Sequence, residues 1–373
     1  MALALRMNFL RTKASGEKGV SSEVKAALKI PLGLLVLLGV GIGVTVYSGH
    51  LLGNKVPKPM PVARAKETTA PSLALSPAPP RFDVPVYYRD KVVALMFHNI
   101  DPTYQGRGTI TPETFEADVK ALVEKGYNVI TAEQLVSFLE GKTQVPPNAV
   151  VITFDDGYKG TYLYAFPVLE KYRVPATVFL IGSFINHHPN FLTWEEVREM
   201  ARSGLVTFGG HTYDLHKGVP IDPHTTSPAT VARIYDFQMG KSETAEAYHA
   251  RVLEDSLKEQ ELFRQEIGKT SPFFAYPYGA YTPELDRALK EAGYSYFFTT
   301  LHGANCYGQD PHHIFRINAG APWITPEKLL QEIRAAALGT SGPRKFPPNY
   351  IPKWTQKPIK SSQSHRQPKV RRG

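Results

Sequence analysis

An apolar run that ends in two adjacent carboxylates decides the fold of this chain: AVVITFDDGY, Ala149–Tyr158. Its first six residues are apolar or β-branched, which is typical of a buried strand. Asp155 and Asp156 follow directly, and Gly157 lets the chain turn. An Asp-Gly pair often only makes a turn, but that explanation does not account for Asp155 directly after the strand. The stretch therefore predicts a buried strand that carries two carboxylates to the end of a sheet.

Strand-like and helix-like patterns alternate on both sides of this stretch, over residues 91–340. Thr111, Thr193 and Thr282 are the expected N-caps of helices that separate the strands. The expected strands lie at residues 92–98, 127–131, 149–154, 176–181, 206–211, 272–277, 294–300 and 313–318. Such alternation is typical of an α/β fold with parallel strands. We predict a distorted or incomplete (β/α) barrel of about seven parallel strands, preceded by one transmembrane helix.

The N-terminal region predicts a membrane anchor. From Ile30 to Leu52 no residue carries a formal charge, and about 20 such residues suffice to cross a bilayer. Residues 1–29 carry six cations and two acidic residues, which places them in the cytoplasm by the positive-inside rule. We expect a single-pass protein of the cell membrane with an extracellular catalytic domain. A cleaved signal peptide is the competing interpretation, although its apolar region is usually shorter.

Three further segments follow the expected anchor. Residues 53–81 are rich in proline and alanine and predict an extended spacer. Residues 82–342 form the expected folded domain. Residues 343–373 carry nine cations, six prolines and no acidic residue, which predicts a basic disordered tail. Contact of this tail with anionic lipid or an acidic wall polymer is compatible with disorder.

The net charge of +9 on 373 residues suggests nucleic acid as a binding partner. The distribution of this charge along the chain gives a different result. Without residues 1–81 and 343–373, the remaining residues 82–342 carry −8. An acidic folded domain argues against nucleic acid as a partner. The single cysteine, Cys306, excludes intrachain disulfides and cysteine-based zinc sites.

Polar side chains recur where the expected strands end. The set consists of His98, Asp155, Asp156, His211, His216 and Tyr278. In a barrel the carboxyl ends of the strands form one mouth, so these groups are expected to converge there. Imidazole and carboxylate together suit zinc or another first-row divalent ion. A single histidine is more often structural, but two beside a carboxylate pair favour a metal site.

Three motifs give the sequence a specific resemblance. TFDDGY, GGHTYDLH and FAYPYG, in this order, resemble the NodB homology domain of polysaccharide deacetylases, carbohydrate esterase family 4, over residues 92–333. The two histidines stand five residues apart, where the family usually has four. This spacing, MFHN at residues 96–99 and DPHHIFRI at 310–317 are similar to the branch that de-N-acetylates poly-β-1,6-N-acetylglucosamine.

The resemblance implies a role for each motif residue. Asp156, His211 and His216 would hold a divalent metal ion, zinc above all, with cobalt or nickel as alternatives. Asp155 would be the general base, and the backbone N–H of Tyr278 would stabilise the oxyanion. Thr212 is expected to orient the histidine loop. His98 is expected to lie in the pocket, with a structural role as the alternative.

The sequence also departs from the family pattern. Ala275 stands where an arginine usually contacts the base. Arg316 is either a replacement for that cation or an ordinary surface or strand-end arginine. The late Leu-x-His motif, which supplies the general acid, has no clear match, and nothing distinguishes His302, His312 and His313. Four aromatic residues are candidates for stacking on sugar rings or for core packing alike: Trp194, Tyr276, Tyr281 and Trp323.

The leading hypothesis is a metal-dependent hydrolase that removes N-acetyl groups from an extracellular polysaccharide containing N-acetylglucosamine, with an exopolysaccharide favoured. A peptidoglycan N-deacetylase and an O-acetyl esterase could use the same residues. A catalytically inactive glycan-binding domain is the alternative from another class. Both carboxylates and both histidines are present, which favours an enzyme.

Overall fold

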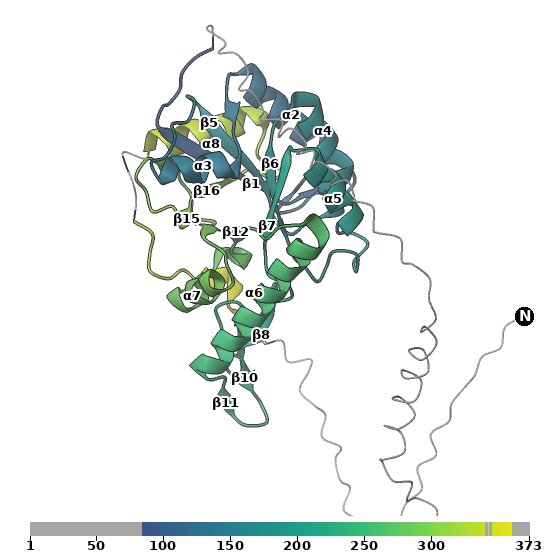
Figure 1. The fold of residues 1–373 in the computed structure, drawn as a ribbon, viewed down its shortest axis with the longest axis vertical. Helices are drawn as coiled ribbons and strands as arrows, with labels where there is room; N and C mark the ends of the chain where they lie inside the picture. Colours follow the sequence, from purple (N-terminus) through teal and green to yellow (C-terminus); the bar gives the residue numbers. More distant parts are fainter. Residues whose placement is uncertain (1–83, 340–341, 343–344, 360–373) are drawn as a thin grey trace, which may run out of the picture. The chain divides into compact units, whose positions relative to one another are not determined.

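The computed structural model describes residues 84–339, 342 and 345–359, and the rest is drawn as a grey trace in Figure 1. The predicted cytoplasmic segment, the apolar segment Ile30–Leu52 and the spacer therefore lie outside the described residues. Among the helices of the described part, none is long and apolar enough to cross a membrane.

A row of parallel strands forms the centre of the domain. Its order is β1 (Lys91–Phe97), β5 (Ala149–Phe154), β6 (Ala176–Leu180), β7 (Val206–Gly210), β12 (Phe273–Ala275) and β13 (Tyr296–Phe298). The seventh position is shared by β15 (His313–Ile314), parallel to β13, and β16 (Arg316–Asn318), parallel to β1. Because only Phe315 separates β15 from β16, one segment joins both ends of the row. The sheet is thus a nearly closed barrel, as predicted.

Two short strands extend this sheet beyond the parallel row. β14 (Asn305–Cys306) pairs with β1 in the antiparallel direction, and β4 (Asn128–Val129) runs parallel to β5. Elsewhere β2 (Asn99–Ile100) pairs with β3 (Thr109–Ile110).

The helices begin where the sequence predicts. Thr111 caps α2 (Pro112–Glu124), Thr193 caps α5 (Trp194–Arg202) in a capping box, and Thr282 caps α7 (Pro283–Glu291). The remaining helices are α3 (Ala132–Leu139), η2 (Thr161–Ala165) with α4 (Phe166–Tyr172), α6 (Ala245–Ile267) and α8 (Pro326–Gly339). In Figure 1, α2, α4 and α5 lie along one side of the sheet, and α6 and α7 pack against each other further round.

Alternation along the strands separates two hydrophobic clusters. In β1, Val93, Leu95 and Phe97 belong to the cluster that also contains buried residues of α2 and α8. Val92 and Ala94 belong to a second cluster with residues of the other strands and of α3. A barrel-like sheet needs this two-sided burial, which explains why its strands are apolar almost throughout.

Residues 217–243 contain short strands. β8 (Gly218–Pro220) and β9 (Thr225–Pro228) form an antiparallel sheet, and β10 (Tyr235–Asp236) pairs with β11 (Lys241–Ser242). The third strand of the first sheet is β17 (Lys357–Pro358), from the C-terminal region.

Part of the C-terminal region is folded, contrary to the predicted disorder of residues 343–373. Disorder was expected from residue 343, yet Phe346 stacks on Phe315 at 4.1 Å between ring centroids. Tyr350 bridges Tyr281, and a short turn, η4 (Lys353–Thr355), leads into β17. The expectation considered only cations and prolines, whereas the aromatic residues among them pack on the domain. Residues 360–373 lie outside the described part.

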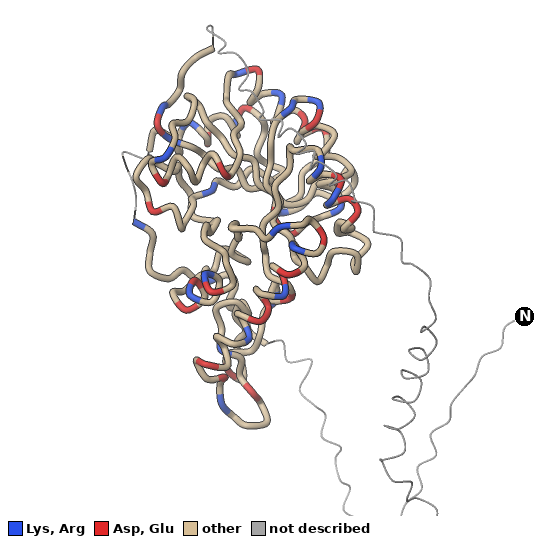
Figure 2. Tube along the Cα trace, viewed as in Figure 1, with Lys and Arg blue, Asp and Glu red and all other residues tan. Residues whose placement is uncertain are grey.

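Acidic and basic residues are interspersed along the helices of the domain (Figure 2). The C-terminal segment brings Lys345, Lys353 and Lys357 into the folded unit, so that it is less acidic than the expected boundary implied.

Candidate active site

The two carboxylates at the end of β5 depend on an unusual backbone. Asp156 and Gly157 both have positive φ, 76° and 80°. A Cβ on Gly157 would come within 2.9 Å of Leu180 Cδ2, so both conformation and space require glycine there. Asp155 and Asp156 are 3% and 7% exposed. Both carboxylates are therefore buried, as is the strand that they follow.

Two histidines face Asp156 from the loop after β7. His211 Nδ1 lies 2.7 Å from the carbonyl oxygen of Ala275, which makes Nδ1 the donor and leaves Nε2 free to act as a ligand. This Nε2 lies 3.3 Å from Asp156 Oδ1, and Nε2 of His216 lies 3.5 Å from the same oxygen. The three ligand atoms lie within 4.8 Å of one another. The structure therefore brings together the three residues predicted to hold a metal.

This cluster fits a first-row divalent ion. Asp156 Oδ1 is buried, and no hydrogen bond to it is found among the described residues. A buried carboxylate oxygen without a donor is costly unless a cation faces it. Burial lowers the pKa of His216 to about 4, which keeps its imidazole neutral as a ligand must be. One oxygen and two imidazole nitrogens are a donor set that zinc accepts.

Helix α6 holds the histidine loop from behind. Glu259 accepts hydrogen bonds from the His211 N–H at 3.1 Å and from the Tyr294 hydroxyl at 2.7 Å. Asp255, one turn earlier, accepts from the N–H groups of Tyr213 and Asp214, both at 2.8 Å. The sequence analysis missed both acids, because nothing local distinguishes them from the surface acids of the same helix.

Thr212 lies within this loop. Its φ of 79° is in the left-handed region, and its Oγ1 accepts a hydrogen bond from the Leu215 N–H at 3.2 Å. That bond closes the turn between His211 and His216. A β-branched residue with positive φ is strained, so the surrounding hydrogen bonds must hold it.

Arg316 binds Asp155 through two parallel hydrogen bonds. Its Nη1 and Nη2 lie 2.7 and 2.8 Å from Oδ1 and Oδ2. Nη1 also donates to Thr153 Oγ1 at 3.2 Å, and Nε donates to the Thr299 carbonyl at 2.8 Å. Burial by itself raises the pKa of Asp155, but the charge of Arg316, followed by that of His211, outweighs it and holds this pKa below its usual value. Arg316 thus supplies the cation that Ala275 cannot.

Tyr278 and His98 border the carboxylate pair and the histidines. Tyr278 has a φ of 59°, and its ring centroid lies 4.5 Å from that of His216. His98 is half-buried at the end of β1, and its Nδ1 is buried with no hydrogen bond to the described residues. The charge of His98 contributes to lowering the pKa of both Asp155 and Asp156, so it lies within electrostatic reach of the pair.

The three late histidines make their contacts elsewhere. His302 lies 3.8 Å from Glu332, and His312 Nδ1 lies 2.8 Å from the Ser295 carbonyl. His313 lies 3.1 Å from Asp286. These contacts lie outside the candidate site.

The aromatic candidates separate into two groups. Trp194, Tyr276 and Tyr281 are buried and pack in the core, whereas Trp323 is 58% exposed. Trp354, which the sequence analysis placed in the disordered tail, lies 6.1 Å from Tyr278 between ring centroids.

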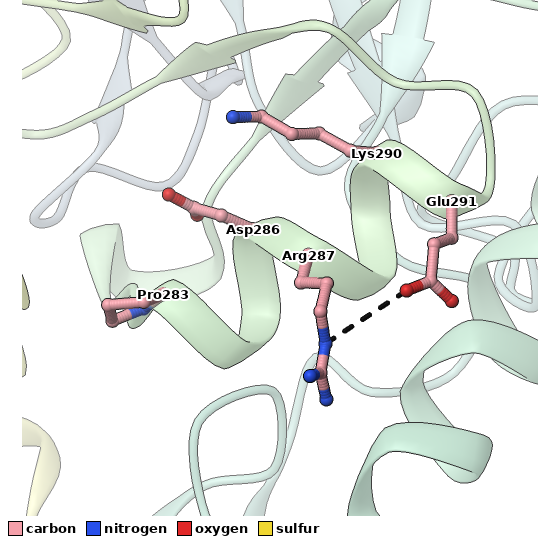
Figure 3. A pocket seen from close by; sticks show the side chains of 5 residues that line it. All are labelled: Pro283, Asp286, Arg287, Lys290 and Glu291. Carbon is pink, nitrogen blue, oxygen red and sulfur yellow. Dashed lines mark ion pairs between the residues drawn. The ribbon is translucent and has the colours of Figure 1, made fainter.

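A surface cavity of about 530 Å³ lies on α7, apart from the candidate site. It is lined by Pro283, Asp286, Arg287, Lys290 and Glu291 (Figure 3). Arg287 and Glu291, one turn apart on this helix, pair at 3.9 Å. None of the site residues lines it.

Comparisons with known proteins agree with this arrangement. Residues 142–297 match the profile of a family described as polysaccharide deacetylase. The chain is 30% identical over 227 residues to the putative polysaccharide deacetylase YxkH of Bacillus subtilis, covering 61% of this chain and 71% of that protein. It is also 30% identical over 228 residues to the poly-β-1,6-N-acetyl-D-glucosamine N-deacetylase of Escherichia coli, covering 57% of this chain. The match spans about a third (34%) of the length of that relative.

Solved structures show the same similarity. A de-N-acetylase from Aggregatibacter actinomycetemcomitans has a TM-score of 0.60 at 26% identity, covering 65% of this chain and 100% of that one. IcaB from Ammonifex degensii has a TM-score of 0.54 at 28% identity, covering 66% and 98%.

Proposed function

Because the chain belongs to the polysaccharide deacetylase family and is therefore a hydrolase, we propose that it removes N-acetyl groups from a polysaccharide containing N-acetylglucosamine. An exopolysaccharide of the poly-β-1,6-linked type is the favoured substrate, since relatives from Escherichia coli and Staphylococcus epidermidis carry that name. The observation that carries the proposal is a buried carboxylate, Asp155, held by Arg316 beside the cluster of Asp156, His211 and His216.

In this proposal Asp156, His211 and His216 hold a divalent metal ion, with zinc favoured and cobalt or nickel as alternatives. When bound, such an ion polarises the acetamide carbonyl and lowers the pKa of water. The side chains and backbone of this chain carry out the proton transfers and help to stabilise the oxyanion.

Asp155 accepts the proton of the attacking water. Its lowered pKa keeps it ionised near neutral pH, and the two bonds to Arg316 fix its orientation. The backbone N–H of Tyr278 donates to the oxyanion that forms on the former carbonyl.

We assign the proton for the leaving amine to His98. Its charge contributes to lowering the pKa of both carboxylates, so it lies within electrostatic reach of them. Its unpaired Nδ1 provides a position for the proton. The products are acetate and a free amine on the sugar.

The test measures acetate release from N-acetylglucosamine oligomers by the purified chain, after a chelator and after addition of zinc, cobalt or nickel. We expect activity that depends on the metal and falls by about 100-fold or more in Asp155→Asn, with metal content unchanged. Asp90→Asn, the same change at an exposed turn, should leave activity intact. Full activity in Asp155→Asn would contradict the mechanism.

The same assay separates the alternatives. Release from acetylated sugar esters but not from amides would indicate an O-acetyl esterase. Release from peptidoglycan fragments alone would indicate a peptidoglycan N-deacetylase. Glycan binding without any turnover would indicate an inactive binding domain.

We also propose that Ile30–Leu52 anchors the protein in the cell membrane with the catalytic domain outside. The uncharged length and the preceding cations support this. Fractionation of cells that produce the full chain should find it in the membrane, with the domain accessible to protease added outside. A variant that lacks residues 1–52 should not sediment with membranes, and a full chain in the soluble fraction would refute the anchor.

A further inference from the structure

A large aromatic side chain stands exposed beside the candidate active site. Trp354, on η4, is 63% exposed. Its ring lies 6.1 Å from that of Tyr278, nearly perpendicular at 78°, and the Tyr278 ring lies 4.5 Å from that of His216. Three rings therefore lead from a proposed metal ligand to the surface.

The backbone on both sides of Trp354 is anchored to the domain. On the N-terminal side, Tyr350 and Tyr281 exchange backbone hydrogen bonds of 2.8 and 2.9 Å. On the C-terminal side, β17 pairs with β9, and Thr226 Oγ1 donates to the Lys357 carbonyl at 3.2 Å. The exposure of Trp354 is thus the property of a fixed position.

Burial cannot explain this position. An indole gains most from removal of its apolar area from water, and here most of that area stays in solvent. Thr355, the next residue, is buried, and its hydroxyl donates to the Pro352 carbonyl at 2.6 Å. The segment therefore buries the smaller Thr355 and leaves the larger Trp354 exposed to solvent.

We propose that Trp354 stacks on the sugar next to the one whose acetamide reaches the metal cluster. This inference rests on the proposed function. A pyranose ring has apolar C–H faces, and a rigid aromatic side chain provides contact area at low cost in conformational entropy. Trp354 is thus a specificity-determining residue, through which the C-terminal segment selects oligomers over single sugars.

The alternative is that Trp354 only covers Tyr278. In that case its loss disturbs Tyr278 and affects every substrate alike, whereas loss of stacking affects only substrates long enough to reach it. The dependence on substrate length therefore distinguishes the two.

The experiment compares kcat/KM for an N-acetylglucosamine monomer and a tetramer in the full chain. In Trp354→Ala the ratio of tetramer to monomer should fall about tenfold, mainly through KM of the tetramer. Trp354→Phe keeps a ring and should recover part of the ratio. Phe237→Ala is the control, since Phe237 is 60% exposed on the β10–β11 hairpin and its ring contacts that of Tyr235 edge-on.

Two outcomes overturn the inference: an unchanged ratio in Trp354→Ala, or an equal loss for monomer and tetramer. If the unsubstituted chain releases no acetate at all, the proposed function fails. The inference is then tested by calorimetric binding of the tetramer. Weaker binding in Trp354→Ala supports stacking, and equal binding rejects it.

Discussion

Asp155 and Arg316 form the most consequential pair of residues in this molecule. Both are buried, and removing two charges from water is costly. The cost is offset because the geometry is bidentate and because Thr153 and Thr299 accept the remaining guanidinium bonds. Loss of either partner leaves a buried charge without compensation, which typically costs about 3–5 kcal/mol. The pair therefore combines a structural role with the proposed activation of the base.

Arg316→Lys should move the acidic limb of the kcat/KM profile to higher pH. Arg316 lowers the pKa of Asp155, and a lysine cannot form the two parallel bonds, so this pKa rises. Because Asp155 must be ionised to accept a proton, activity is then lost at a higher pH as acid is added. Arg287→Lys, at an exposed pair, is the control. An unmoved acidic limb would mean that Asp155 is not the base.

Asp118 offers a separate test through stability. It lies fully buried in α2, its two carboxyl oxygens make no hydrogen bond to the described residues, and burial, then the charge of Glu327, raises its pKa to about 8. A raised pKa in the folded state means that stability falls as pH rises from about 4 to 8, since only the unfolded chain ionises freely there. Asp118→Asn should remove this loss and stabilise the protein at pH 7.

The measurement is urea unfolding of the two proteins at several pH values between 4 and 8. Glu113→Gln, at an exposed position of the same helix, should follow the unsubstituted chain. Parallel stability curves for Asp118→Asn and the unsubstituted chain would show that Asp118 is ionised in the folded state.

At the scale of elements, α6 positions the loop that carries the two histidines. Asp255 and Glu259 stand one turn apart and therefore share one face of the helix. They accept backbone N–H groups from both sides of the strained Thr212. Gly210 lets the strand approach this face, because a Cβ there would collide with Glu259 and Tyr294. Helix α6 thus stabilises a backbone turn whose conformation its own residues do not favour.

Glu259→Leu should weaken metal binding by about 10- to 100-fold. The His211 N–H loses its acceptor, and the His211 side chain is then no longer held in the orientation that a ligand needs. Glu259→Gln keeps an acceptor oxygen and should lose less. Competition with a chromogenic zinc chelator measures both. Glu254→Leu, at an exposed position on the same helix, should bind zinc as the unsubstituted chain does. Equal zinc affinity in Glu259→Leu would show that α6 is not needed to position the ligands.

At the scale of the whole molecule, closure of the sheet and the C-terminal segment decide what surrounds the site. β15 and β16 bring Arg316 from the last strand to the end of β5. Residues 345–359 then pair with Tyr281 and with β9, and place Trp354 beside Tyr278. The packing of the described residues therefore continues to residue 359, beyond the expected domain boundary at 342.

Two truncations test this boundary. A chain that ends at residue 342 loses the stacking on Phe315 and the third strand of the β8–β9 sheet, and should unfold roughly 5 °C or more below the full chain. A chain that ends at residue 359 should match the full chain in Tm. Thermal unfolding followed by circular dichroism measures both Tm values. Identical Tm values for the two truncations would show that residues 343–359 do not stabilise the fold.

The sequence by itself determined what depends on near neighbours along the chain. Apolar runs with capping residues between them predict the strands and helices of the barrel, because caps and periodicity act within a few residues. The strand-end positions of Asp155, Asp156, His211 and His216 follow from the same local pattern. The tertiary structure alone decided which distant groups meet. Arg316 reaches Asp155 only because the last strand pairs with the first, and Glu259 reaches His211 only because α6 packs behind β7. Trp354 lies beside Tyr278 only because aromatic packing, which local composition does not reveal, outweighs the cations and prolines of its segment.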